Sequence, residues 1–534
     1  MCHYNDRHDY FMSQLPYGIL SMGAYLEKKG HDVTVANFSS RGQRGALKYI
    51  QANLPDILGV SLFSFNRVDT LKLIKTVKKK YPGVRIVAGG PHATFLAEQI
   101  LSRYPEIDHI ICGEGEQALD NLVRDISAGR KPPVIIQGDR ITNIDEMPPV
   151  SGFRGAMIGV NPNEQFKFIV TTRGCPNRCT FCSSPAFWKR RVSYRSAEDI
   201  YSEIRDLNKK YGIIYFAFRD DNFTLKKDRV IKLSQMLQKS GMYIMWNCQA
   251  RVDTVDEDML VEMKRAGLEH IQYGVESGSE RILASYDKGA DIDDIVRASE
   301  ITRRVGVYLS IYLMAGMAGE TGRDIRKTLA LIRRILPGDG MVSPVALYPG
   351  TALYEKLKAG GEVSDDIWFK SRDAGIFLRH DPAVGEWVRE LVNELGIIRE
   401  RSWYREKDFQ GHRKICGSGC WVTDILEGDY YLDEELFESA GSMYEGVTGM
   451  YPENPWGHMR MGKLRFLTGD FESSASHYES VTRIVPAFYG GWLKSAEAHM
   501  ACGRKKEAAA GIREAHKRNS RDARVRNLMK ILKA

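Results

Sequence analysis

Six short apolar segments alternate with helical segments between residues 165 and 355, and no other feature constrains the fold as strongly. Strands that alternate with helices build parallel sheets, because each helix returns the chain to start the next strand in the same direction. A closed barrel of this kind has eight units, so six units predict a partial (β/α)6 barrel that is open on one side. The predicted strands are 166–172, 213–218, 243–249, 269–275, 307–314 and 341–348.

A second alternation of strands and helices precedes the barrel. Apolar runs bounded by turn residues are typical of buried parallel strands. This pattern predicts an open, doubly wound (Rossmann-like) α/β sheet, whose ligands bind at the carboxyl ends of its strands. Residues 1–12 are polar and aromatic and show no strand pattern. The predicted strands are 31–38, 57–65, 84–90 and 107–116, and helices are predicted over 17–30 and 68–83.

The C-terminal part of the chain is predicted to be all-α from about residue 436, after an irregular linking segment. Glycine, aromatic and proline residues recur there with a 34-residue period and resemble about two tetratricopeptide units, with a degenerate third before them. Such repeats stack into a concave peptide-binding surface, and a helical cap on the barrel is the alternative. The consensus-like positions are Gly462, Gly469, Phe471, Tyr478 and Pro486. The predicted domains are 1–145, 160–360, 361–435 and 436–534.

Charge and hydropathy exclude several classes of protein. No apolar run approaches the roughly 20 residues of a membrane helix, and no signal peptide is visible, so we expect a cytoplasmic protein. The formal net charge is +8, and residues 501–534 alone account for it, with 11 Lys/Arg against three acidic residues. We interpret this basic tail as a solvated helical face, because nothing else in the chain suggests a nucleic-acid channel.

Three cysteines, Cys175, Cys179 and Cys182, follow the first predicted barrel strand with the spacing C-x3-C-x2-C. Closely spaced thiolates select soft metals, and four of them normally complete a [4Fe–4S] cluster. Three cysteine thiolates leave one iron of such a cluster open to a small chelating molecule. A zinc site would need a fourth ligand, and the next cysteine is Cys248. The motif therefore predicts an iron–sulfur cluster with an open position.

With this motif on a predicted barrel, the segment resembles the radical S-adenosylmethionine (SAM) superfamily. The resemblance implies that SAM chelates the open iron and is cleaved reductively to a 5′-deoxyadenosyl radical. It also implies that Asp220 and Asp221 hold the SAM amine, although helix capping is an alternative for one of them. Arg251, Glu276 and Ser277 are implied contacts of the carboxylate and ribose of SAM.

The N-terminal segment resembles cobalamin-binding α/β domains. These carry D-x-H-x-x-G, then S-x-L, then G-G, and the last two match here. In the first motif Ser13 replaces the aspartate and Leu15 the histidine, so no side chain of that motif ligates cobalt from below. His92 is expected beside the corrin and not on the cobalt. The implied cobalamin-binding residues are Leu15, Gly18, Ser61, Gly89, Gly90 and His92.

Together the two segments resemble the class B, cobalamin-binding radical SAM family. This family has a strand ahead of the first helix, so either the start is late or the sheet lacks that strand. Glu114 and Glu116 are expected in a solvated loop, with contact to the nucleotide tail of cobalamin as the alternative. Cys416 and Cys420 are expected to be ordinary thiols, with a second cluster as the alternative.

The resemblance implies a cobalamin-dependent methyltransferase that acts on an unactivated carbon, with a [4Fe–4S] cluster, SAM and cobalamin as cofactors. A cyclisation, coupling or rearrangement without methylation is the alternative. A third reading is an interaction protein with a vestigial core, which the intact cysteines oppose. An RNA-modifying methylthiotransferase would need further domains whose patterns are not visible. The expected partners are a flavodoxin or ferredoxin, an unidentified peptide, lipid or small-molecule substrate, and a protein bound by the repeats.

Overall fold

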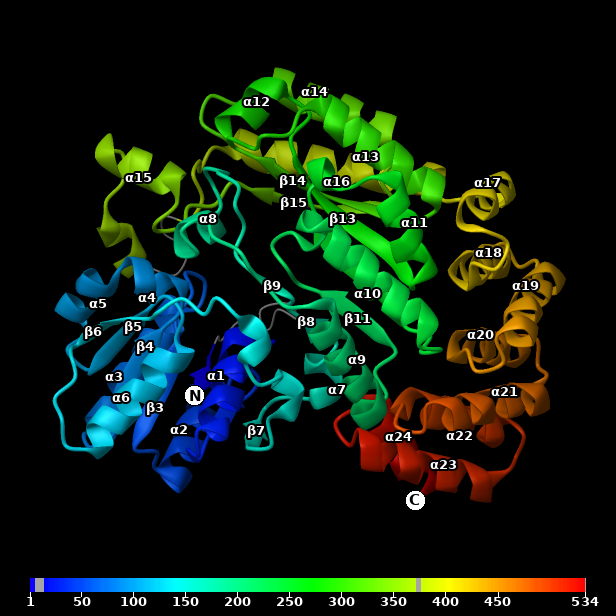
Figure 1. The fold of residues 1–534 in the computed structure, drawn as a ribbon, viewed down its shortest axis with the longest axis horizontal. Coiled ribbons are helices and arrows are strands. Elements are labelled where there is room, and N and C mark those ends of the chain that lie inside the picture. The colour runs from blue at the N-terminus through cyan, green and yellow to red at the C-terminus, as the bar shows by residue number, and fades with distance from the viewer. Residues whose placement is uncertain (5–13, 371–375, 534) are drawn as a thin grey trace.

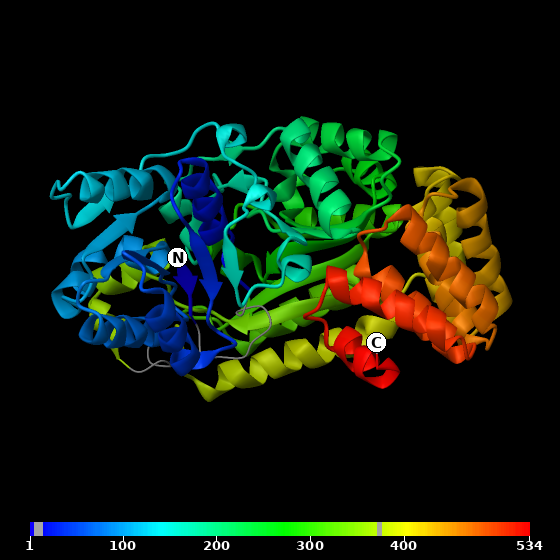
Figure 2. The ribbon, with the colours of Figure 1, turned by 90° about the horizontal axis from the view of Figure 1, so that it is seen from below.

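A computed structural model describes residues 1–4, 14–370 and 376–533 of the chain. Three parts lie in a row: an N-terminal α/β sheet, a central curved sheet with helices, and a C-terminal array of helices (Figures 1 and 2). The order of these parts along the molecule follows their order in the sequence. The predicted fold class is therefore confirmed.

The central sheet is the predicted partial barrel. Its six strands are all parallel and adjacent in chain order, from β8 at one edge to β15 at the other. Side chains on one face of β13, such as Ile271, Tyr273 and Val275, are fully buried under the outer helices. The strands are β8 (Phe168–Ile169), β11 (Tyr215–Phe218), β12 (Met245–Ala250), β13 (Leu268–Glu276), β14 (Tyr308–Ala315) and β15 (Asp339–Pro344). The helices between them are α9 (Ala197–Tyr211), α10 (Lys227–Lys239), α11 (Glu257–Arg265), α12 (Glu280–Ser285), α13 (Ile292–Val305) and α14 (Gly322–Ile335).

The N-terminal sheet has seven parallel strands in the order β6-β5-β4-β3-β1-β2-β7. Strand β1 lies inside the sheet, where it pairs with β2 through Cys2 and His3 and with β3 through Cys2. The sheet therefore has a strand ahead of its first helix, and the alternative that it lacks this strand is wrong. The strand was not visible in the sequence because two residues are too short to show a periodic pattern. The strands are β1 (Cys2–His3), β2 (Thr34–Asn37), β3 (Ile57–Ser61), β4 (Arg85–Gly89), β5 (His109–Cys112), β6 (Ile135–Gln137) and β7 (Ala156–Ile158).

Helices cover the N-terminal sheet on both faces, as expected of a doubly wound fold (Figure 1). Strand β7 pairs with β2, so the sheet extends beyond the predicted boundary at residue 145. The helices are α1 (Tyr17–Lys28), α2 (Gly42–Asn53), α3 (Arg67–Lys80), α4 (Pro91–Phe95), α5 (Ala97–Arg103) and α6 (Glu116–Ser127).

The segment predicted to be irregular, 380–435, forms three helices instead: α16 (Pro382–Ser402), α17 (Glu406–Cys416) and α18 (Trp421–Asp433). Helix α16 has a helical start signal, because the Asp381 side chain caps Ala383 N and a proline occupies the first turn. Its buried residues Val384, Leu391, Leu395 and Ile398 are spaced as one helix face requires. The prediction of an irregular segment is therefore wrong.

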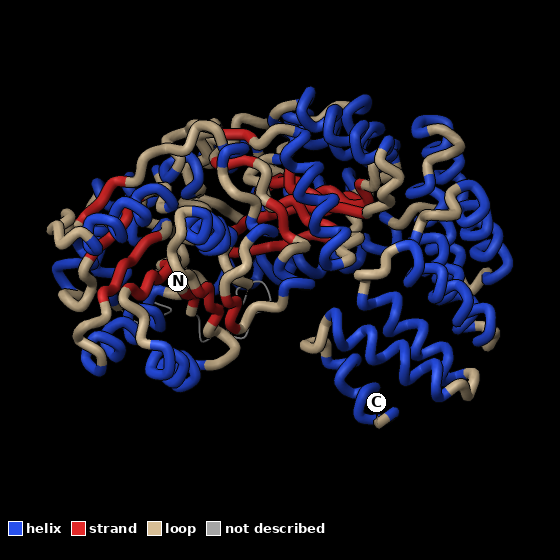
Figure 3. The backbone as a smooth tube through the Cα atoms, turned by 60° about the horizontal axis from the view of Figure 1, so that its bottom comes forward, coloured by secondary structure: helices blue, strands red, loops and turns tan. Residues whose placement is uncertain are grey.

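Helices α18 to α24 repeat at the predicted interval. Alternate helices begin at residues 421, 455, 489 and 523, each 34 after the one before. Close packing repeats as well, because a Cβ atom on Gly428 would lie 2.3 Å from the Tyr444 ring, and one on Gly462 would lie 2.9 Å from the Tyr478 ring. This part contains helices without strands (Figure 3). The remaining helices are α19 (Phe437–Met450), α20 (Pro455–Leu467), α21 (Phe471–Ile484), α22 (Tyr489–Ala501), α23 (Lys505–Arg518) and α24 (Ala523–Leu532).

Among the residues that the structure describes, no helix has both the length and the apolar character that crossing a membrane requires. The assignment of the helical repeats to the tetratricopeptide class remains a prediction.

Candidate functional site

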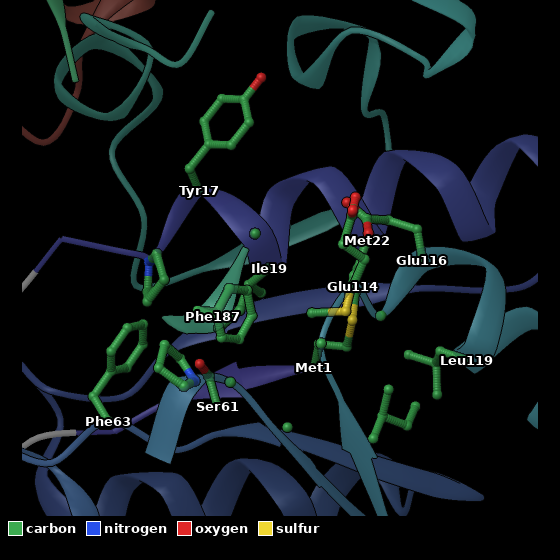
Figure 4. A pocket seen from close by; sticks show the side chains of 18 of the residues that line it. Met1, Tyr17, Ile19, Met22, Ser61, Phe63, Glu114, Glu116, Leu119 and Phe187 are labelled. Carbon is green, nitrogen blue, oxygen red and sulfur yellow. The ribbon is translucent and has the colours of Figure 1, made fainter. Parts of the chain in front are cut away.

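A cavity of about 310 Å³ lies where the carboxyl ends of the N-terminal strands face the barrel. Figure 4 shows Tyr17 and Met22 on α1 above it, Ser61 and Phe63 below it, and Glu114 and Glu116 at one side. The barrel side of the wall includes Gly174, Phe187, Trp188 and Asp221. Residues far apart in the sequence thus enclose one space between the two α/β parts.

Glycine-rich turns after the strands form the N-terminal wall of the cavity. Four of the predicted cobalamin residues, Gly18, Ser61, Gly89 and Gly90, line it. Gly90 has a φ of +94°, and a Cβ atom there would lie 2.9 Å from the carbonyl oxygen of Leu62. Only glycine satisfies this conformation without strain, and the missing side chains let a large flat ligand approach the backbone.

Two other predicted cobalamin residues do not line the cavity. The backbone N–H of Leu15 donates to Gln165 Oε1 at 3.1 Å, and its carbonyl accepts from Gln165 Nε2 at 3.0 Å. His92 is 1% exposed and lies beside Ser64 and Trp368. Burial lowers the pKa of His92 to about 3. His92 is therefore a neutral, buried residue behind the glycine turn, and Ser13 lies outside the described residues.

The cluster loop, residues 175–182, connects β9 (Thr172–Arg173) to α8 (Ser183–Phe187). Strand β9 pairs with β10 (Ser193–Tyr194) in an antiparallel ribbon at the carboxyl end of β8. The loop is anchored across the barrel, because Thr180 N donates to Tyr286 O at 2.8 Å. Gly174, with a φ of +97°, starts the loop where a Cβ atom would collide with Arg191 O at 2.1 Å.

The thiols of the cluster loop suit a metal cluster better than they suit free cysteine. Burial raises the pKa of Cys182 to about 12 and also raises that of Cys179, so both side chains are protonated thiols when no metal binds them. An iron–sulfur cluster supplies that positive charge. No three acidic, histidine or cysteine side chains in the described chain converge as ligands of a single ion. In a cubane cluster each cysteine binds a different iron, so the three sulfur atoms lie farther apart than the ligands of a single ion.

The two predicted SAM aspartates have different environments. Asp220 is 1% exposed, and its carboxylate accepts from Thr171 N at 2.5 Å, from Thr172 N at 3.0 Å and from the Thr171 hydroxyl. Asp221 lines the cavity and accepts from Ser184 Oγ at 2.5 Å, while burial raises its pKa. Asp220 therefore holds the start of the cluster loop, and only Asp221 faces the cavity.

Two of the remaining SAM candidates gather around Cys179. Arg251 Nη1 lies 3.7 Å from Cys179 Sγ, and Arg251 Nη2 donates to the Lys288 carbonyl at 2.7 Å. Lys288 also pairs with Glu276 at 2.8 Å, and Glu276 has the unusual φ of +67°. Ser277 lies apart, fully buried, with its hydroxyl 3.4 Å from that of Thr328.

A buried ion-pair network, not foreseen from the sequence, joins the two parts at the cavity wall. Arg173 Nη1 donates to Glu114 at 2.7 Å, and Nη2 donates to Glu116 at 2.6 Å and to Ser21 Oγ at 3.0 Å. The two glutamates are 9% and 3% exposed, so the expectation of a solvated loop is wrong. Arg173 directly precedes the cluster loop, so the network ties that loop to the N-terminal sheet. A basic residue next to the cluster motif was the only sequence signal.

Comparison with known proteins agrees with this geometry. The radical SAM superfamily matches residues 169–332, and the B12 binding domain matches residues 13–123. An uncharacterized methyltransferase of Pyrococcus horikoshii is 30% identical over 405 residues, which are 72% of this chain and 87% of the relative. The anaerobic magnesium-protoporphyrin IX monomethyl ester cyclase of Rubrivivax gelatinosus is 25% identical over 370 residues, 65% of this chain and 66% of that enzyme.

Among solved structures, the radical S-adenosylmethionine methyltransferase TsrM from Kitasatospora setae superposes with a TM-score of 0.60. The match has 17% sequence identity and covers 76% of this chain and 89% of that one, which shows a shared fold. Two family matches that meet at one cavity, and a relative similar over most of its length, lead to one assignment. The chain belongs to the B12-binding radical SAM family.

Proposed function

We propose that the protein is a cobalamin-dependent radical SAM methyltransferase that acts on an unactivated carbon. One observation carries this proposal: the glycine turns of the N-terminal sheet and the start of the cluster loop line the same cavity. A corrin on one wall and SAM at the cluster loop would therefore lie close enough to act on one substrate. The methyltransferase of Pyrococcus horikoshii supports the same reaction class.

The residues divide the binding between them. When bound, the cluster supplies the electron that cleaves SAM, and cobalamin carries the methyl group. Cys175, Cys179 and Cys182 would hold three irons, and Asp221 would accept from the SAM amine. Arg251 and Glu276 stand beside Cys179, where they would orient the rest of SAM.

The cavity wall suits cobalamin without a protein ligand to its cobalt. No histidine lines the cavity among the residues described. Tyr17, Phe63, Phe187 and Trp188 provide apolar walls that exclude water from the space between the glycine turns and the cluster loop. Both features suit a corrin whose lower face stays open.

Two glycine variants test the corrin site. Gly18→Ala adds a methyl group where no atom lies within 4 Å, in the first turn of α1. Folding should be unaffected, while anaerobically purified protein should bind less cobalamin and keep its iron. Gly90→Ala puts a Cβ atom against Leu62 O and should both weaken cobalamin binding and destabilise the N-terminal sheet. If both variants bind cobalamin as the unmodified protein does, the cavity is not the corrin site.

The second candidate is a cyclisation, coupling or rearrangement without methyl transfer. The similarity to the magnesium-protoporphyrin cyclase favours it. SAM turnover separates the two: methylated product with S-adenosylhomocysteine supports methyl transfer, whereas product with only 5′-deoxyadenosine and methionine supports the alternative. The assay is run with and without added cobalamin.

The family requires a reductant and a substrate. We propose a flavodoxin or ferredoxin as the electron donor and a cytoplasmic location, where such donors act. The helical repeats would recruit a protein partner or a peptide substrate on their concave face. A lipid or another small molecule is the alternative substrate class. Nucleic acid is not expected to bind.

A further inference from the structure

Two cysteines far from the cluster loop lie together in the turn between α17 and α18. Cys416 ends α17, and Cys420 is the N-cap residue of α18. The chain reverses at Gly417, with a φ of +85°, and Cys420 N donates to the Gly417 carbonyl at 3.2 Å. Cys416 Sγ donates to the Val305 carbonyl at 3.5 Å, and both thiols are free and line the same cavity.

In the described chain, no third His, Cys, Asp or Glu side chain converges with this pair on a single metal ion. It also lies at the opposite end of the barrel from the cluster loop. The cavity beside it is lined by Tyr243 and Ala266, which precede β12 and β13. The cluster loop lies at the other, carboxyl, ends of these strands. Figure 1 shows α17 and α18 on the outside of the barrel, with α11 between them and the sheet.

The surroundings of the pair are electropositive. Cys420 sits at the amino end of α18, where the helix dipole favours a negative charge. Lys264 of α11 is fully buried, donates to the Gly306 carbonyl, and forms no ion pair with a carboxylate of the described residues. Burial lowers the pKa of Lys264, and a negative charge on either cysteine raises it, so the ammonium group and a thiolate stabilise each other. The neighbouring Cys416 thiol, together with Lys264 and Thr423, lowers the pKa of Cys420.

Other charged groups around the pair are already engaged. Arg265 pairs with Glu262 at 3.1 Å and donates to the Cys416 carbonyl at 2.9 Å. Asp424 accepts from Arg413 at 2.8 Å. The Tyr451 hydroxyl, across the turn, donates to the Gly419 carbonyl at 2.5 Å. Lys264 is thus the cation that remains to balance a thiolate.

A cavity gives small molecules a route to the pair. Its volume is about 300 Å³, and both cysteines line it together with Gly419, Arg265, Tyr243 and Tyr451. The two cysteines are each 3% exposed, so proteins of ordinary size would be excluded. Tyr243, whose hydroxyl has no hydrogen bond among the described residues, offers a polar contact to a small ligand in this cavity.

We propose that Cys416 and Cys420 form a redox-active dithiol that reduces low-molecular-weight disulfides, with Cys420 as the attacking thiol and Cys416 as the resolving thiol. The Cys420 thiolate attacks one sulfur of the small disulfide, forms a mixed disulfide and releases one thiolate. Cys416 then gives its proton to the released thiolate and attacks the Cys420 sulfur, which expels the second small thiolate; this thiolate takes its proton from water. Two electrons pass from the dithiol to the small disulfide, and the products are two small thiols and a Cys416–Cys420 disulfide.

Oxidised glutathione is the probe for this reaction. The full-length protein, with its cluster in place, is incubated anaerobically with the probe and mapped by mass spectrometry. We expect the peptide that contains both cysteines to lose two hydrogens. With Cys416→Ser the mixed disulfide at Cys420 should accumulate, and with Cys420→Ser neither product should form at this turn. Iron content serves as the check that each variant is folded.

Cys502 is the matched control because it is more accessible, half-buried on the C-terminal helices, and its pKa is raised. If exposure alone decided reactivity, Cys502 would react first. Lys264→Met replaces the lysine with a neutral side chain of similar length and should slow the alkylation of Cys420 about threefold at neutral pH. Loss of the positive charge lowers the fraction of Cys420 that is thiolate, and the higher nucleophilicity of each thiolate offsets part of this loss. Faster reaction at Cys502 than at Cys420, or no mixed disulfide in folded Cys416→Ser protein, would overturn the proposal.

Discussion

The cluster loop and the turn between α17 and α18 both bring cysteines together, yet their surroundings direct them to different chemistry. In the cluster loop the thiols are spaced along an irregular segment whose start is held by Asp220 and Arg173 and which Thr180 anchors to Tyr286. In the turn, Cys416 and Cys420 pair directly at two helix ends beside a buried lysine. Spaced thiols can hold a metal cluster, whereas paired thiols can exchange with a disulfide. The surrounding structure therefore decides the chemistry of these cysteines, because it sets whether their thiols lie apart or together.

The largest expected effect separates the two groups of cysteines. Cys179→Ala should reduce iron content and SAM cleavage to background, because a cluster with two protein ligands is not retained. Cys420→Ala should leave both unchanged while abolishing disulfide formation in the turn. Iron analysis, visible absorption and a SAM-cleavage assay measure this. Loss of iron in Cys420→Ala would show that the cysteines of the turn and those of the cluster loop are not independent.

The second prediction concerns the support of the cluster loop from the N-terminal sheet. Arg173→Met leaves Glu114 and Glu116 buried without their partner, which should destabilise the junction by about 3–5 kcal/mol. Hydrogen exchange should rise in 109–127 and in the cluster loop, but not in α17 or α18. The triple variant with Glu114→Gln and Glu116→Gln should recover much of the loss. An equal rise of hydrogen exchange in the cluster loop and in α17 and α18 would contradict the inference that Arg173 supports the cluster loop alone.

The sequence predicts local features of these sites better than their long-range partners. The C-x3-C-x2-C motif and the six barrel strands are visible because their signals are contiguous and repeat. The helical spacing of Val384, Leu391, Leu395 and Ile398 was equally readable, so α16 was within reach of pattern analysis. Strand β1 was not, because two residues carry no period.

The roles of individual polar residues depend on contacts that no local pattern encodes. Asp220 and Asp221 are neighbours of identical type, and only the fold shows that one binds Thr171 while the other faces the cavity. Arg173 finds Glu114 and Glu116 across the domain junction. His92 matches a motif in sequence, yet it is buried beside Ser64 and Trp368 and does not line the cavity that the motif glycines line. The roles of such residues are therefore set by tertiary contacts.

The third prediction tests the turn through pH. Burial and the nearby Lys264 lower the pKa of His412, on α17, to about 4 from its ordinary value of 6.5. The unfolded chain therefore binds more protons than the folded one between these values, so stability falls as pH drops from 6.5 to 4, by at most about 3 kcal/mol. Protection factors of the α17 amides, which correct exchange for its intrinsic pH dependence, should therefore fall over this range. His412→Gln, which can still donate to Arg303 O, should remove this fall; its persistence would assign the effect to another group.

The smallest effect separates two adjacent residues at the cluster loop. Asp220→Asn keeps one acceptor oxygen but loses charge-assisted bonds to Thr171 and Thr172, and it should cost about 1–3 kcal/mol, seen as faster exchange at the start of the loop. Asp221→Asn keeps a partner in Ser184 and should leave exchange unchanged, while SAM affinity falls. The opposite result, with Asp221→Asn loosening the loop and Asp220→Asn changing only SAM affinity, would exchange the two roles. Because both variants remove one charge from neighbouring positions, each is the control for the other, and the loop's dependence on distant contacts is tested without disturbing a cysteine.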